Sequence, residues 1–183
     1  MQRQYRSGES VPRQIQQGNL RGVSMYNDHV TVFNFYESPT TGEITWYPHS
    51  LQMCNLIVDR GAALKQYGPN STDTAQLHIK WYNDVDSPDS EDIKILENSG
   101  AFVTYVGPTD WKKQTNDMLP KTITFSDKDF FMRGKWTGPS EVSEDDYRSG
   151  FYQYMNSNRD DVYKISSVGG PYPVIPHFEI LGK

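Results

Sequence analysis

The chain has 183 residues, of which 36% are hydrophobic and 22% are charged, and its formal net charge at pH 7 is −5. A chain of this length can bury a self-supporting core as one domain, and a single cysteine, Cys54, excludes an intrachain disulfide. The negative charge argues against a surface that grips nucleic acid over its whole extent by neutralising phosphates. No run approaches the ~18 apolar residues of a membrane span, and the first residues lack the apolar core of a signal peptide. We therefore expect a protein that stays in the cytosol or in particles assembled there.

Residues 1–24 are expected to form an extended N-terminal arm. Their low apolar content, together with Gly8, Pro12 and Gly18, predicts that they cannot fold alone. Four arginines, opposed only by Glu9, make the arm basic and a candidate contact with a partner: Arg3, Arg6, Arg13 and Arg21. A disordered solubilising tail, a segment that orders on a neighbouring subunit, and a direct DNA contact all stay open.

Residues 25–183 are expected to form a single β-rich domain. The alternation in HVTVFNFYE predicts a half-buried strand, and the turn SPTTGE joins it to ITWYPHSLQMCNLIVD in a hairpin. Pro48 predicts a bulge or a break in the second strand, because proline cannot donate to the ladder. A connecting loop follows, with one helical turn expected at residues 62–66.

The segment AQLHIKWY alternates cleanly, which places Leu77, Ile79 and Trp81 on the inner face and makes Tyr82 a candidate surface aromatic. The next segment is a surface loop, and IKILENSGAFVTYVGP predicts a strand pair around residues 98–100. Residues 110–120 support no assignment.

The stretch from Ile123 to Lys183 predicts strand, turn, helix, strand, bend and strand. A helix is expected over about 143–156, capped by Ser143, with an apolar stripe formed by Tyr147, Phe151, Tyr154 and Met155. A bend is expected at residues 169–171, and the last strand should build the C-terminus into the fold. The fold class is therefore mainly β with one α-helix in the C-terminal half (α+β), as a small barrel or sandwich with long loops and an N-terminal arm.

Residues suited to catalysis or metal binding form no recognisable motif. The histidines are scattered singly, and the chain has neither a G-x-S-x-G nucleophile elbow nor a glycine-rich phosphate loop. Cys54 lies in an apolar setting that indicates a buried, inert thiol. We expect no enzyme, no cofactor and no metal, although a carboxylate pair suited to hydrolysis cannot be recognised from sequence alone.

Two further groups of residues are candidates for surface roles. An acidic run fails the EF-hand pattern and is interpreted as a solvated loop: Asp84, Asp86, Asp89, Glu91 and Asp92. The remaining aromatics favour a core and a subunit interface over a platform for stacking sugars or bases: Trp46, Tyr47, Trp81, Trp111 and Trp136.

Three segments carry a resemblance to a known group of proteins: DFFMRGKW, DDVYKISSV and PHFEILGK. In them the chain resembles small, uncharacterised minor capsid proteins of Gram-positive phages, and its plan is similar to that of head-closure (stopper) proteins in the neck of tailed bacteriophages. The resemblance implies a β-barrel with one helix and an arm, arranged as a homo-hexameric ring between the portal-bound adaptor and the tail. It implies a structural virion protein, assembled in the host cytoplasm, whose partners are the portal adaptor and the tail-tube or tail-terminator protein.

In such a ring, phage DNA would pass without sequence-specific binding, and the acidic loop 84–92 would face the lumen or the rim. A tail terminator and a minor capsid protein are neighbouring versions of the same hypothesis. A carbohydrate-binding β-module, which needs exposed coplanar Trp or Tyr side chains, and a hydrolase with a carboxylate pair are the alternatives from other classes.

Overall fold

The computed structural model describes residues 25–59, 73–83, 91–115 and 117–183. The N-terminal arm, 1–24, and the helical turn expected at 62–66 lie outside these residues. The mainly β fold with one helix in the C-terminal half is confirmed.

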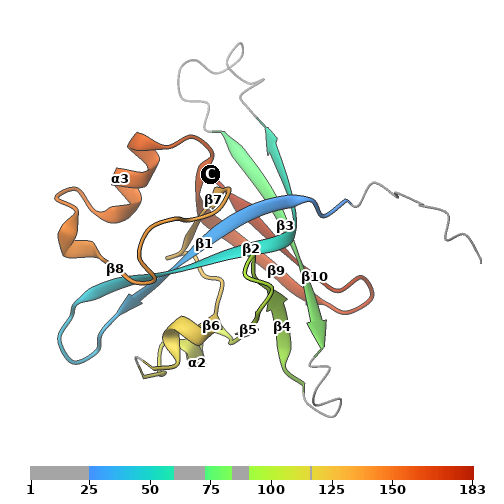
Figure 1. Ribbon diagram of the computed structural model, residues 1–183, viewed down its shortest axis with the longest axis horizontal. Helices are drawn as coiled ribbons and strands as arrows, with labels where there is room; N and C mark the ends of the chain where they lie inside the picture. Colours follow the sequence, from blue (N-terminus) through green and yellow to red (C-terminus); the bar gives the residue numbers. More distant parts are fainter. Residues whose placement is uncertain (1–24, 60–72, 84–90, 116) are drawn as a thin grey trace, which may run out of the picture.

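Six antiparallel strands form a closed barrel (Figure 1). Each strand pairs with the next in the order β1, β2, β3, β10, β9 and β7, and β7 pairs with β1 to complete the circle. The strands are β1 (Asp28–Glu37), β2 (Ile44–Asp59), β3 (Thr74–Asn83), β7 (Phe130–Arg133), β9 (Val162–Tyr172) and β10 (His177–Gly182). The predicted hairpin is β1 and β2, and the predicted C-terminal strand is β10.

Apolar side chains fill the barrel interior because successive residues of a strand point to opposite faces. Phe131 belongs to the interior cluster, whereas its neighbours Phe130 and Met132 belong to a second cluster on the outer face. Leu77, Ile79 and Trp81 are buried, as the alternation in β3 predicts. The interior is therefore a packed core.

A smaller sheet extends from β3 and contributes to the same core. It contains β4 (Ile93–Leu96), β5 (Phe102–Tyr105) and β6 (Thr122–Ile123), and the predicted strand pair around residues 98–100 is β4 and β5. The unassigned segment holds the short helix α2 (Pro108–Trp111) and the 3₁₀ turn η1 (Leu119–Lys121), where Trp111 and Leu119 pack against Tyr36 and Tyr47.

The predicted helix begins later than expected. Helix α3 runs Phe151–Asn158, preceded by the strand β8 (Val142–Ser143) and the 3₁₀ turn η2 (Glu144–Asp146). Ser143 makes no capping hydrogen bond, and Gly150, at φ 87°, separates the turn from the helix. The predicted apolar stripe is confirmed for Phe151 and Met155, which are buried against the outer face of the barrel. It is wrong for Tyr147, which precedes the helix, and for Tyr154, which is exposed.

Two backbone predictions are wrong. Pro48 causes neither a bulge nor a break, and it pairs regularly with Phe33 of β1. On the other edge of β2, β8 pairs with residues before Pro48 and β3 pairs with residues after it. The proline, which has no N–H, therefore lies where that edge needs no donor. The bulge lies instead at Met53, whose φ is 58°. The bend expected at 169–171 is strand, and the chain turns at 173–176.

Gly150 offers a test of how α3 is positioned. A Cβ at Gly150 would lie 2.7 Å from Oε1 of Glu144, whereas one at Gly100, which has the same φ of 87°, would meet nothing within 4 Å. Both alanine variants should lose about 1–2 kcal/mol from the left-handed backbone. Gly150→Ala should lose about 1–3 kcal/mol more, because the Glu144 carboxylate is displaced from its hydrogen bonds. Urea unfolding of the two variants measures the difference, and equal losses would contradict this account.

Candidate functional site

The predicted acidic loop and basic arm lie mostly outside the described residues. This holds for Arg3, Arg6, Arg13, Arg21, Asp84, Asp86 and Asp89. Glu91 and Asp92 are exposed just before β4, and a carboxylate oxygen of Asp92 lies 3.8 Å from Nζ of Lys94. The lumen assignment of this loop stays a prediction.

Tyr82 is half-buried on the outer face of β3. Its ring lies edge-on to Phe102, with ring centroids 5.5 Å apart, and Nζ of Lys80 lies 5.0 Å from its centroid. Tyr82 is therefore one member of a small surface pair rather than an isolated aromatic side chain.

The tryptophans are mostly unavailable for stacking on a ligand. Trp46, Trp81 and Trp111 are buried, and half-buried Trp136 packs edge-on against Phe33 while its Nε1 donates to the carbonyl of Pro139 at 2.8 Å. A carbohydrate-binding module would therefore have to use tyrosine rather than tryptophan side chains.

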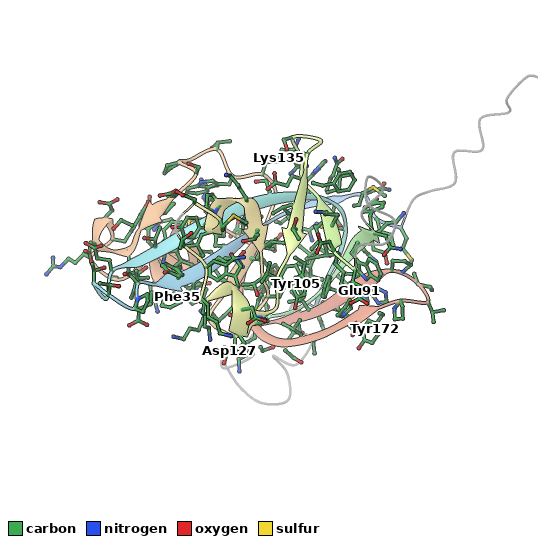
Figure 2. The ribbon with its side chains drawn as sticks, turned by 90° about the horizontal axis from the view of Figure 1, so that it is seen from below. Phe35, Glu91, Tyr105, Asp127, Lys135 and Tyr172 are labelled. Atoms are coloured by element: carbon green, nitrogen blue, oxygen red, sulfur yellow. The ribbon has the colours of Figure 1, made fainter. Side chains whose placement is uncertain are left out.

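A hollow with a volume of about 970 Å³ lies beside α3 and β9. Figure 2 shows Phe35 and Asp127, two of its residues, to the left of Tyr172. Its lining includes acidic and basic side chains together: Asp73, Asp127, Lys128, Glu144, Arg159, Asp160, Asp161, Lys164 and Lys183. We call it the charged groove.

Glu144 fixes the start of α3 in this groove. Its Oε2 accepts hydrogen bonds from Nε1 of Trp46 at 2.6 Å and from the backbone N–H of Phe151 at 3.1 Å. The carboxylate thus caps the helix from the preceding turn and attaches it to β2. This is the capping role that the sequence analysis assigned to Ser143.

Asp129 is fully buried beneath the groove. Its carboxylate accepts hydrogen bonds from the backbone N–H of Phe35 at 2.7 Å and from the N–H and Oγ of Ser126 at 2.7 and 2.9 Å. Burial raises the pKa of Asp129 to about 7, although these hydrogen bonds act in the opposite direction. Local sequence does not reveal this burial, because the β1 backbone that Asp129 contacts is distant in the chain.

Lys164 lies above Asp129 with its stem among aromatic side chains. Its Nζ donates to the carbonyl of Lys128 and lies 5.6 and 5.4 Å from the ring centroids of Trp46 and Tyr152. Burial lowers the pKa of Lys164, and the charge of Asp129 opposes that effect.

These groups are engaged in holding the fold together. Asp129 has no exposed surface from which to reach a substrate, and Glu144 is committed to Trp46 and the start of α3. Cys54 is buried and burial raises the pKa of its thiol, which suits an inert cysteine. Across the described ranges, no three His, Cys, Asp or Glu side chains are grouped to hold a metal ion.

A second surface lies at the turn between β9 and β10, which we call the hairpin tip and define as residues 172–176. Val174 is 94% exposed and Ile175 64% exposed, and Tyr172 is also largely exposed. Figures 1 and 2 show this hairpin at the edge of the molecule, away from α3. The sequence analysis missed it, although two aliphatic residues in a proline-rich turn, PYPVIP, were the available signal.

The fold and these surfaces define a small closed barrel with a packed interior, a helix on one side and an apolar tip at one end. The chain belongs to the family of unknown function DUF6751, whose profile matches residues 25–183. Neither the curated proteins nor the solved structures include a significant match to the chain. In the part of the chain that the structure describes, no helix has the length and apolar character needed to cross a bilayer.

Asp129 makes stability depend on pH in a defined direction. Because its folded pKa is raised, folding takes up a proton between about pH 4 and pH 7, so the free energy of unfolding falls as pH rises through this window, by at most about 1.4 kcal/mol per pH unit. In Asp129→Asn this pH dependence of the free energy of unfolding should disappear. The variant should also be less stable at every pH, because its amide NH₂ would face backbone N–H donors.

Urea unfolding across that pH range, for wild type and variant, gives the two slopes. Asp127→Asn, an exposed change in the same turn, is the control and should keep the wild-type slope. Equal slopes for wild type and Asp129→Asn would show that Asp129 does not titrate in this window.

Proposed function

We propose that this protein is a structural component of the neck of a tailed bacteriophage. Its copies form a ring that joins the portal-bound adaptor to the tail and helps to close the DNA-filled head. The observation that carries the proposal is the hairpin tip, because Val174 and Ile175 are exposed on a domain whose core is otherwise well packed. We interpret these two adjacent, exposed aliphatic side chains as part of an interaction site.

The packing of the barrel suggests that the protein acts through contacts on its outer surface. Its interior is filled by side chains from all six strands, and the charged groove is occupied by groups that hold α3 and β9 in place. A structural ring protein needs stable contact surfaces rather than a reactive centre. The resemblance in the C-terminal segments points to the same class, and a tail terminator or a minor capsid protein would make the same demands on the fold.

The proposed partners are further copies of the chain, the portal adaptor, and the tail-tube or tail-terminator protein. A net charge of −5 would let DNA pass through the ring without binding to it. No enzymatic activity is part of this proposal.

Light scattering of the purified protein tests the assembly. We expect either a ring of about six times the 21.0 kDa chain mass or a monomer that assembles when mixed with the adaptor and tail proteins encoded beside it. An unrelated phage coat protein is the control mixture. A monomer that stays monomeric in every mixture would contradict the proposal.

A further inference from the structure

We propose that the hairpin tip of one copy inserts into an apolar groove at the opposite end of the barrel of a second copy. This contact rests on the proposed ring and names the surfaces through which its neighbours meet. The groove, which we call the β2–β10 groove, has a volume of about 370 Å³ and is lined by Ile57, Asp59, Thr74, Ala75, Gln76, Ser166, Leu181, Gly182 and Lys183.

Strand register brings the two apolar side chains of this groove together. Gln76 pairs with Ile57 on one side and with Leu181 on the other, so the three side chains form a row across β2, β3 and β10. Ile57 is 52% exposed and Leu181 is 41% exposed, which shows that the row faces away from the core. Two aliphatic side chains, on the strands either side of β3, make an apolar site for a small protrusion.

The tip and the groove lie at opposite ends of one strand. The tip precedes β10, whereas Leu181 stands near its other end, roughly 15–20 Å away at 3.3 Å per residue. Lys183, the last residue, lines the groove. Figure 1 shows the C-terminus far from the turn of the hairpin. A copy cannot fill its own groove, and a contact between two different surfaces is the head-to-tail type that generates rings.

The charges around both surfaces suit this contact. Residues 165–178 contain no Asp, Glu, Lys or Arg, so inserting the hairpin desolvates no full charge of its own. Lys80 stands opposite His177 at the base of the tip, while Asp59 and Lys183 line the groove. Lys80 of one copy can therefore face Asp59 of the next, which favours one orientation of insertion.

The size of the contact explains how the ring should behave in solution. The exposed apolar tip is on the order of a few hundred Å², less than the ~800 Å² per partner that a stable interface buries. One contact is therefore weak, and closure of a ring, in which every copy makes two contacts, supplies the remaining stability.

Disulfide trapping tests the pairing directly. Val174→Cys and Leu181→Cys are prepared as separate proteins, mixed and mildly oxidised. Buried Cys54, the only native cysteine, leaves little background. The mixture should give a crosslinked dimer, and the variant with both changes should give a ladder of multimers. Val174→Cys mixed with Phe102→Cys, an exposed position on the smaller sheet, is the matched control and should give no more crosslinking than Val174→Cys alone.

Light scattering of Val174→Glu and Phe102→Glu completes the design, because both residues are exposed and neither change should unfold the chain. Loss of assembly in Val174→Glu alone would support the contact. Assembly of the wild type without the Val174–Leu181 crosslink would overturn this inference and leave the proposed function standing. A wild type that never assembles, alone or with neck proteins, would overturn the proposed function itself.

Discussion

Closure of the barrel depends on β10, which pairs with β3 along one edge and with β9 along the other. Without these two ladders the remaining strands would form an open sheet with two exposed edges. β10 also contributes Phe178 and Ile180 to the interior, so the same strand closes the sheet and fills its core. The hairpin tip and the β2–β10 groove are located by the two ends of this strand, and their separation follows from the closure.

Closure of the barrel also leaves apolar side chains on its outer face, and α3 covers them. Alternation along β1, β2 and β7 places one set of apolar residues inside and leaves Phe33, Trp46 and Phe130 on the outer face. Phe151 and Met155 of α3 cover them. Two buried or half-buried carboxylates secure this layer: Glu144 connects β2 to the start of α3, and Asp129 joins the turn before β7 to β1. Polar groups in the charged groove therefore serve the packing of the layer.

The elements that were predicted correctly share a local cause. The hairpin of β1 and β2, the inner face of β3 and the pair β4 and β5 follow from alternation and turn residues within one short segment. The errors occur where a distant residue supplies what the local chemistry lacks. Glu144 replaced Ser143 as the cap because Trp46 orients its carboxylate. Pro48 is tolerated because it lies between the β8 and β3 pairings on one edge of β2, where no described strand needs its N–H.

Local patterns in the sequence are enough to identify the long strands β1, β2, β3 and β10, the apolar face of β3 and the burial of Cys54, because these properties depend on near neighbours in the chain. Three features depend on contacts between distant parts of the chain: the closure of six strands into a barrel, the complete burial of Asp129, and the positions of Ile57 and Leu181 on either side of Gln76. The physical reason is that pairing between distant strands is set by the burial of the whole core at once, so no single segment contains the information that places one strand beside another.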